Sequence, residues 1–494
     1  IWNEPMKKNG MRFSLIPYMA SKASVDNQTD GKTIWNRDAG FDAKMILSSS
    51  LNIDLTVNPD YSQVEQDQQV TNLDRFELFF PERRQFFLEN NDLFANLGKS
   101  GIQPFFSRRI GLEVPVIGGA RLSGQLGDHW RIGILNMQTS SQGITPSANF
   151  TTAVLQRQVF SRSNIVGFIV NKLVTSDFND TIYSGNNYNT VAGLEFNVAS
   201  LNNRWTGKAF YHQAFYPGAS KTSAATSGRV IYSKQYFRAS FDQSWVGNDY
   251  LAEVGYIRRK GYLRSTPSLE YTFYPTKSKI LTHGPSVDFD IIFNPKLDMT
   301  DRKTQIEYSI GWRNKNKLSF KLNEQFVKLN RSFDPTNTDS VELESGSDYK
   351  WRNTSIDFSS DTRRLFNYAL NAGFGGYYNG TRITFGTNFN YRVQPFGSIS
   401  VIANYNDISL PRPYSSARFL LIGPKLDLTL TDKLFITTFA QYNNQIDNFN
   451  LNIRFQWRFA PVSDLFLVYT GNSYTYDFTN KNRGLAIKMS YWFK

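Results

Sequence analysis

The sequence predicts an all-β protein, a transmembrane antiparallel β-barrel of about 24 strands (roughly 22 to 26). Two observations predict it: a two-residue alternation of apolar and polar side chains, and an aromatic content that is high for a chain of low hydropathy. Phe, Tyr and Trp make up 15% of the 494 residues, whereas all hydrophobic residues make up 40% and the mean hydropathy is −0.42. Alternating strands suit this composition, because only every second residue must be apolar.

The alternation is clearest between Phe449 and Phe459, where every odd-numbered residue is apolar and every even-numbered residue is polar. The same period occurs at 51–58, 306–313, 382–391 and 485–494. Such runs, about 9 to 14 residues long, can cross a bilayer as tilted strands, whereas strands of soluble sandwiches have about 5 or 6 residues. Lipid cannot satisfy the edges of an open sheet, so the predicted sheet must close. Its polar face then lines a wet lumen.

The connections between these runs alternate between short turns and longer loops. The longer loops lie near 140–147, 176–187, 216–226, 330–347 and 473–481. In bacterial barrels the short turns are periplasmic and the long loops are external. We therefore expect a bacterial outer-membrane location with both termini periplasmic. Residues 227–262 fit either one long strand or two short ones.

One connection is too long to be a plain loop. We divide the chain into the first barrel strands at 1–59, this connecting segment at 60–112, and the remainder of the barrel at 113–494. Within 60–112, paired aromatic residues stand between charged residues, as in a segment that packs inside a polar lumen. We interpret it as an inward-folded plug or constriction, with an external cap as the alternative.

The charged residues of this segment are the candidate pore or plug residues. They are Glu77, Glu82, Arg83, Arg84, Glu89, Arg108 and Arg109. In a narrow pore, the paired arginines at 83–84 and 108–109 would favour anionic solutes. The alternative is that they bind acidic residues of the barrel wall and hold the segment in place. The two roles are compatible.

Several motifs resemble a family of outer-membrane proteins that is widespread in the Bacteroides–Flavobacterium group and is catalogued as a domain of unknown function. They are LTVNPDYSQVE at 55–65, RFELFFPERR at 75–84, FFLE at 86–89, SRRIG at 107–111, IGGA at 117–120 and GYIRR at 255–259. The resemblance covers the whole chain and is most specific over 51–139. It implies a barrel, and it supplies no catalytic residues.

Members of that family commonly carry, ahead of the barrel, a domain similar to family 9 carbohydrate-binding modules. The chain opens on Ile1 and Trp2 without a signal peptide. We therefore expect the N-terminal domain to be missing from this chain. The resemblance also implies that transported solutes would be derived from glycans.

The residues give no support for catalysis, for a metal site or for a cofactor. The chain has no cysteine, and its three histidines, His129, His212 and His283, are not at metal-ligand spacing. His212, near the end of a predicted strand, is the one candidate for catalysis at the barrel rim. A histidine of a polar rim or lumen wall is the favoured interpretation. We expect no enzymatic activity.

A loose series of carboxylates in the long segment is a weak candidate for a divalent cation site, without the spacing of a calcium loop. It comprises Asp60, Glu65, Asp67, Asp74 and Glu77. The net charge of +13 comes from bases scattered singly along the strands, which does not favour nucleic acid as a partner. The expected partners are outer-membrane lipid and lipopolysaccharide, together with other outer-membrane proteins or lipoproteins.

Two functions therefore stand ahead of the others. The first is a channel or uptake protein for solutes, gated or narrowed by residues 60–112. The alternative is a non-enzymatic scaffold or accessory subunit of a secretion or assembly complex, with a sealed lumen. An enzyme at the rim ranks third.

Overall fold

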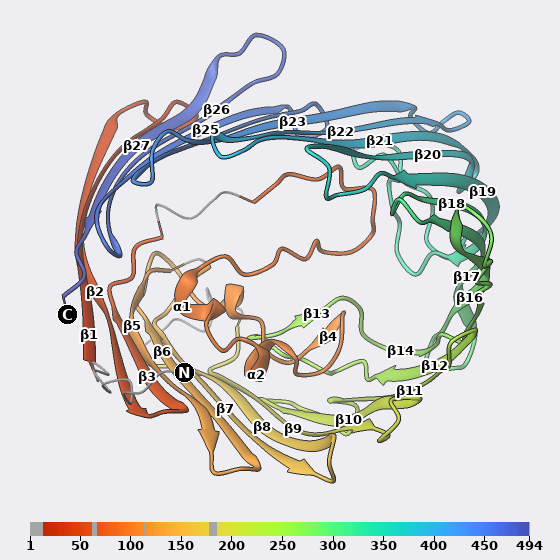
Figure 1. Ribbon diagram of the computed structural model, residues 1–494, viewed down its shortest axis with the longest axis horizontal. Coiled ribbons are helices and arrows are strands. Elements are labelled where there is room, and N and C mark those ends of the chain that lie inside the picture. The colour runs from red at the N-terminus through yellow and green to blue at the C-terminus, as the bar shows by residue number, and fades with distance from the viewer. Residues whose placement is uncertain (1–12, 62–66, 113, 177–184, 339, 494) are drawn as a thin grey trace.

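The computed structural model describes residues 13–61, 67–112, 114–176, 185–338 and 340–493. One antiparallel sheet closes on itself into a barrel (Figure 1), because β1 (Phe13–Asp26) pairs with β2 (Thr33–Ser48) on one side and with β27 (Asn480–Ser490) on the other. Among the described residues the barrel sheet has 25 strands in 24 places, since β14 and β15 both pair with β12 and with β16. This confirms the predicted fold class and strand number.

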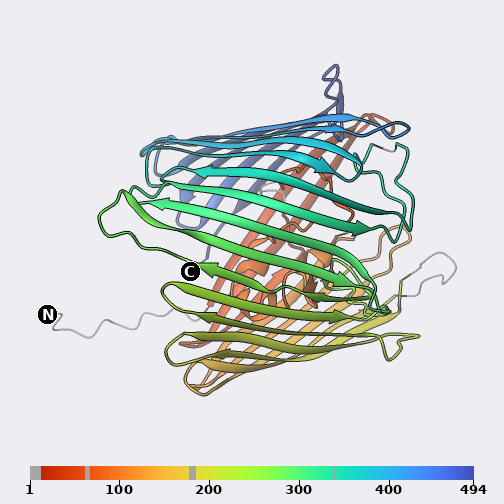
Figure 2. The ribbon, with the colours of Figure 1, turned by 90° about the vertical axis from the view of Figure 1, so that its right-hand side faces the viewer.

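The remaining strands of the barrel follow one another around the wall and pair in antiparallel fashion. Their bounds are β3 (Leu51–Val57), β5 (Val116–Leu126), β6 (Trp130–Thr139), β7 (Ala148–Val159), β8 (Ser163–Val174), β9 (Tyr188–Ala199), β10 (Trp205–Phe215), β11 (Ala224–Ser233), β12 (Phe237–Val246), β14 (Tyr262–Ser265), β15 (Ser268–Tyr271), β16 (Ile280–Phe293), β17 (Met299–Trp312), β18 (Lys317–Lys328), β19 (Asp348–Ser359), β20 (Phe366–Tyr377), β21 (Gly380–Val393), β22 (Gly397–Ser409), β23 (Ala417–Thr429), β24 (Leu434–Asn443), β25 (Asn448–Ala460) and β26 (Ser463–Ser473). Figure 2 shows them running obliquely from one rim to the other.

The two faces of the wall follow directly from the alternation. On β25 the apolar Ile453 and Trp457 point outward and are exposed, whereas the polar Asn450 and Asn452 point inward and are buried. An apolar outer face combined with a polar lumen face, as on this strand, is typical of a barrel that spans a membrane. In the part of the chain that the structure describes, no helix has the length and apolar character needed to cross a membrane.

Residues 58–115, here called the long inward segment, leave the wall after β3 and return to it at β5. They contain the short helices α1 (Gln85–Leu88) and α2 (Asp92–Ala95), the strand β4 (Ile102–Gln103) and the 3-10 turn η1 (Ser107–Arg109). Figure 1 shows the ribbon of the described residues of this segment (58–61, 67–112, 114 and 115) inside the ring of strands.

A second departure from the wall lies between β12 and β14. Residues 247–261, here called the short inward segment, contain β13 (Tyr256–Ile257), which pairs with β4. The sequence did not indicate this departure: within 227–262 the chain forms most of β11, all of β12 and then leaves the wall. The GYIRR motif at 255–259 lies in this segment.

The main hydrophobic core lies inside the barrel, where both inward segments pack against one half of the wall. Long-segment residues in it are Phe87, Leu93, Phe94, Leu97, Ile102, Phe105 and Ile110. They meet lumen-facing apolar residues of β5–β12 and β14, together with Tyr250, Ala252 and Val254 of the short segment. Burying such side chains contributes roughly 1.5–3 kcal/mol each. The long inward segment is therefore a packed part of the fold.

A candidate solute passage

A buried carboxylate of the wall, that of Glu195, binds the loop that follows α2. Glu195 of β9 accepts a hydrogen bond from the backbone N–H of Gly98 (2.5 Å), and its other oxygen lies 2.6 Å from Nζ of Lys208. Gly98 has φ +71°, and a Cβ there would lie 2.0 Å from the carbonyl oxygen of Ile102, so only glycine fits. This contact fixes the loop against β9 and β10.

His212, the one residue considered for catalysis, belongs to this same contact. Its side chain is fully buried, its Nε2 lies 3.0 Å from Glu195, and its ring stacks on Phe210 and meets Phe168 edge-on. It therefore sits in the lumen wall, packed on all sides. In this place it has a structural role.

A second buried contact joins the wall to α1. Arg121 of β5 is 2% exposed, donates two hydrogen bonds to Asp54 of β3 (2.7 and 3.2 Å) and donates another to the carbonyl oxygen of Phe86. The buried charge is paired and hydrogen-bonded, as a charge in a low dielectric must be.

A polar bridge closes the long inward segment on itself. Arg84 pairs with Glu82 (2.7 Å) and donates to the carbonyl oxygens of Ile110 (2.8 Å) and Ser107 (2.6 Å), while the Ser107 hydroxyl donates to Glu82 (2.6 Å). Burial alone would raise the pKa of Glu82, but the hydrogen bonds from Arg84 and Ser107 outweigh it and hold that pKa below its usual value.

All seven candidate charged residues of the long segment take part in ion pairs. Besides the Glu82–Arg84 pair, the contacts are Arg83 and Arg108 with Asp67, Arg109 with Glu77, and Glu89 with Lys44 and Arg121. The arginines of these pairs bind carboxylates of the long segment itself, whereas the expectation placed them on acidic residues of the wall; among these pairs, only those of Glu89 reach the wall, at Lys44 and Arg121. Their action on a solute stays a prediction.

The carboxylates considered for a cation bind basic side chains instead. Asp60 pairs with Lys488, Asp67 with Arg83 and Arg108, and Asp74 with Arg258. Glu65 lies outside the described residues. Among the residues that the structure describes, no group of three or more His, Asp or Glu side chains is placed to hold a metal ion.

A cavity of about 1520 Å³ lies between the long inward segment and the part of the wall that runs from β11 to β22. One side is formed by residues 70–79 and 95–103, and the other by wall strands from β11 to β22 and by the short inward segment. A second cavity of about 400 Å³ is lined by Asp60, Tyr61, Glu82 and Arg83 among others. The lumen thus retains open space beside the packed segment.

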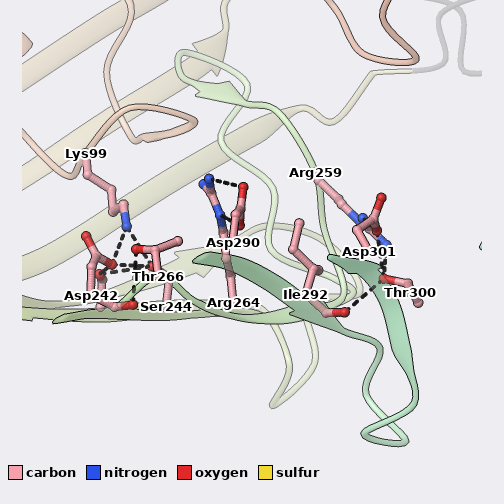
Figure 3. A network of polar contacts seen from close by, with 11 residues as sticks. Lys99, Asp242, Ser244, Arg259, Arg264, Thr266, Asp290, Ile292, Thr300 and Asp301 are labelled. Atoms are coloured by element: carbon pink, nitrogen blue, oxygen red, sulfur yellow. Dashed lines mark hydrogen bonds and ion pairs between the residues drawn. The ribbon is translucent and has the colours of Figure 1, made fainter. Parts of the chain in front are cut away.

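Basic side chains outnumber acidic ones around the large cavity. Its lumen-facing bases are Arg75, Lys99, Arg229, Arg258, Arg259, Arg264, Lys303 and Arg382, and its acids are Asp74, Glu77, Asp242, Asp290 and Asp301. Each acid is paired with a base: Lys99 with Asp242, Arg264 with Asp290 and Arg259 with Asp301 appear in Figure 3. Arg258 pairs with Asp74, and Arg109 with Glu77.

Three cations of this lining remain without a carboxylate partner among the described residues: Arg229 of β11, Lys303 of β17 and Arg382 of β21. The Arg382 guanidinium lies over the ring of Tyr377, 4.7 Å from its centroid. No motif in the sequence sets these three residues apart from the other bases that are scattered along the strands. The alternation along each strand places these three side chains on the lumen face, and it is the feature of the sequence from which they could be identified.

Fold and lumen together define a transmembrane β-barrel, of the type found in bacterial outer membranes, whose interior is partly filled by two inward segments. The chain belongs to the family described as a domain of unknown function (DUF5916), whose model matches residues 9–125 and 128–414. The motifs on which the resemblance rested all lie within the matched residues. The bacterial group and the accompanying carbohydrate-binding domain stay predictions.

Comparison with curated proteins gave no match. Among solved structures, the siderophore receptor PirA of Pseudomonas aeruginosa is similar at 10% identity and TM-score 0.47, over 97% of this chain and 80% of that one. The FrpB iron transporter of Neisseria meningitidis has 10% identity and TM-score 0.42, over 98% and 81%. OpdQ of Pseudomonas aeruginosa has 10% identity and TM-score 0.31, over 97% of each chain. Likenesses this distant leave the function to be argued from the lumen.

Proposed function

We propose that this protein is an outer-membrane channel or uptake protein for anionic solutes, with its termini in the periplasm and its lumen narrowed by the long inward segment. The observation behind this proposal is the cavity of about 1520 Å³ beside that segment, with its surplus of bases. In this proposal the solute passes through the cavity, along the wall strands from β11 to β22, because the packed segment occupies the other side of the lumen.

The electrostatic argument rests on the paired and unpaired charges of the lining. Its five acids are neutralised by bases, whereas Arg229, Lys303 and Arg382 are not neutralised by acids. Low-dielectric walls focus the field of such charges and raise the local concentration of oppositely charged solutes. An anion is therefore concentrated in this cavity and a cation is depleted from it.

Glycan-derived anions are the solute class that we favour. Trp351, Tyr377 and Tyr378 line the cavity, as do Asn404 and Asn406. Aromatic faces and amide groups supply the apolar contacts and directed hydrogen bonds by which a small-molecule site recognises its ligand. The resemblance to a family with a carbohydrate-binding domain motivates the same choice.

The experiment that tests this function is the reversal potential of the purified barrel in planar bilayers under a KCl gradient. We expect steady conductance with chloride favoured over potassium. Replacing Arg229, Lys303 and Arg382 with Gln should lower the chloride-to-potassium permeability ratio by roughly threefold or more, because the unpaired charges are gone. The matched control is Arg418→Gln, which removes an outward-facing, exposed cation and should leave the ratio unchanged.

Two results would contradict the proposal. Conductance without anion preference would mean that the lining charges do not select the solute. Complete electrical silence of the intact protein would favour the alternative, a scaffold with a sealed lumen. In that case stoichiometric partners should be recovered after gentle detergent extraction.

A further inference from the structure

The outward face of the barrel is almost free of charge over much of its circumference. By the strand registers, the described barrel strands from β8 to β16 place no Asp, Glu, Lys or Arg on that face. This is the expected surface for contact with lipid chains, since a charge there costs about 2–4 kcal/mol at the bilayer midplane. A cluster of charges on this face therefore requires an explanation.

Such a cluster lies on β17, β18 and β19. Glu324 of β18 accepts a hydrogen bond from Arg302 of β17 (2.9 Å) and two from Arg352 of β19 (2.9 and 2.8 Å), and Nζ of Lys350 lies 3.4 Å away. Three cations share one carboxylate, so the cluster keeps two formal positive charges. Side chains of Lys350 and Arg352 are 56% and 72% exposed.

The cluster faces away from the lumen. Its positions share their strand faces with exposed apolar residues, Ile306 on β17, Leu322 on β18 and Ile356 on β19. Side chains at every second position of a strand point to the same side. The cations therefore border the apolar belt of the barrel.

The cluster also lies toward one rim. Arg302 and Arg352 are near the first residues of β17 and β19, and Glu324 is near the last residue of β18. The rim next to them carries the connection 329–347, one of the longest of the barrel. Because long loops are external in bacterial barrels, the cluster falls at the level of the outer-leaflet headgroups.

We propose that Arg302, Lys350 and Arg352 form a binding site for a phosphate group of an outer-leaflet glycolipid of the lipopolysaccharide type. Phosphate oxygens accept charge-assisted hydrogen bonds, and guanidinium groups match them with two parallel donors. Glu324 orients both arginines and leaves the surplus charge for the anion. The acyl chains of the lipid lie along Ile306, Leu322 and Ile356.

A phosphorylated lipid fits this surface better than a free phosphate ion. The cations adjoin an apolar belt that inorganic phosphate cannot use, whereas a lipid buries its chains on it. The inference rests on the outer-membrane location proposed above, but it is independent of solute passage. Lipid binding and conductance are measured separately, so failure of one is distinguishable from failure of the other.

The test is native mass spectrometry of the full chain in detergent, titrated with a lipid A that carries two phosphates. We expect one retained lipid per barrel in the unmodified protein. The double variant Lys350→Gln, Arg352→Gln should bind it about tenfold or more weakly, because charge-assisted hydrogen bonds to the phosphate are lost. The same lipid without phosphates should bind the unmodified protein as weakly as it binds the variant.

Arg157→Gln is the matched control. Arg157 also faces outward, over the ring of Trp130 at 5.1 Å, but it lies near the last residue of β7, toward the opposite rim. Its replacement should leave binding unchanged. The single variant Lys350→Gln, which loses only the peripheral 3.4 Å contact, serves if the double variant does not fold.

Equal affinity of the unmodified and double-variant proteins would overturn the inference, as would equal affinity for lipid with and without phosphates. A further arm uses inorganic phosphate alone. If free phosphate competes with the lipid at equal concentration, the cluster is a site for a soluble anion and the lipid assignment is wrong.

Discussion

The contribution of a single ion pair to the stability of this barrel depends on how deeply the pair is buried. The Arg121–Asp54 pair is almost fully enclosed, whereas the Arg131–Asp92 pair, which joins the neighbouring strand β6 to α2, is half exposed. Breaking a buried pair leaves an uncompensated charge and costs about 3–5 kcal/mol, while exposed pairs contribute about 0–1 kcal/mol. Only the first pair should matter to how the long segment is held.

We therefore expect Arg121→Gln to loosen α1, because it leaves Asp54 without its main partner and Phe86 without its donor. The amide hydrogens of residues 85–90 should exchange faster, by an amount that corresponds to a decrease of about 3 kcal/mol in the free energy of local opening. Arg131→Gln should change the free energy of local opening, measured in the same way, by less than about 1 kcal/mol. Equal effects of both variants would show that burial does not decide the strength of these contacts.

At this scale the sequence identified charged residues but not their partners. The motif arginines and glutamates at 82–84 and 107–109 were recognised as candidates. Apart from Glu82 and Arg84, which pair although they are only two residues apart, the partners lie far away in the sequence, as Asp67 does from Arg108, and come close only when the segment folds. Neither spacing nor periodicity contains that information, so the unpaired cations of the lumen could not be separated from the paired ones.

The elements of the wall could be predicted because each one obeys a local rule. A two-residue period fixes the strand and also its inner and outer face. The inward segments lack any period, and the two helices of the long inward segment have four residues each, too short for a helical repeat to show. Their position depends on packing against the wall, which is why the short inward segment was missed.

The polar bridge formed by Glu82, Arg84 and Ser107 makes the stability of the folded long segment depend on pH. Because the pKa of Glu82 is held below the usual value of 4.5, its ionised form stabilises the folded segment above that pH. This stabilisation is lost as the pH falls through the lowered pKa. We expect hydrogen exchange of residues 85–106, corrected for intrinsic rates, to increase in that acidic range.

Glu82→Gln provides the control for this prediction. The amide keeps the shape of the side chain but cannot ionise, so exchange should be faster at neutral pH and its remaining pH dependence should shrink. If the unmodified protein and the variant respond to acid identically, another carboxylate governs the segment.

For the whole molecule, the wall is complete without the long inward segment. β3 and β5 pair directly along their length, from Leu51 with Gly124 to Val57 with Gly118. The backbone N–H of Asn58 also donates to the carbonyl oxygen of Ile117 (2.7 Å). A two-stranded hairpin with a short turn could therefore replace the entire excursion.

We expect deletion of residues 60–114, with a short Gly/Ser turn in their place, to leave a closed barrel whose single-channel conductance is larger than that of the intact protein. Mobility in unheated detergent gels checks that the barrel is folded. Replacing the loop 140–147, which we expect to be external, with a short turn is the matched control and should leave conductance nearly unchanged. A folded deletion variant with unchanged conductance would rule out a narrowing role for the segment.

The position of the packed half of the lumen has a consequence for the order of assembly. The long inward segment packs on β5–β12 and β14, the strands that directly follow it in the chain. These apolar contacts need neither β27 nor its junction with β1, whereas the pair between Asp60 and Lys488 of β27 forms only when the last strand is in place. The segment can therefore dock on a growing, still open sheet, and the last strands enclose it as the ring closes. No part of the chain has to be threaded into a finished barrel.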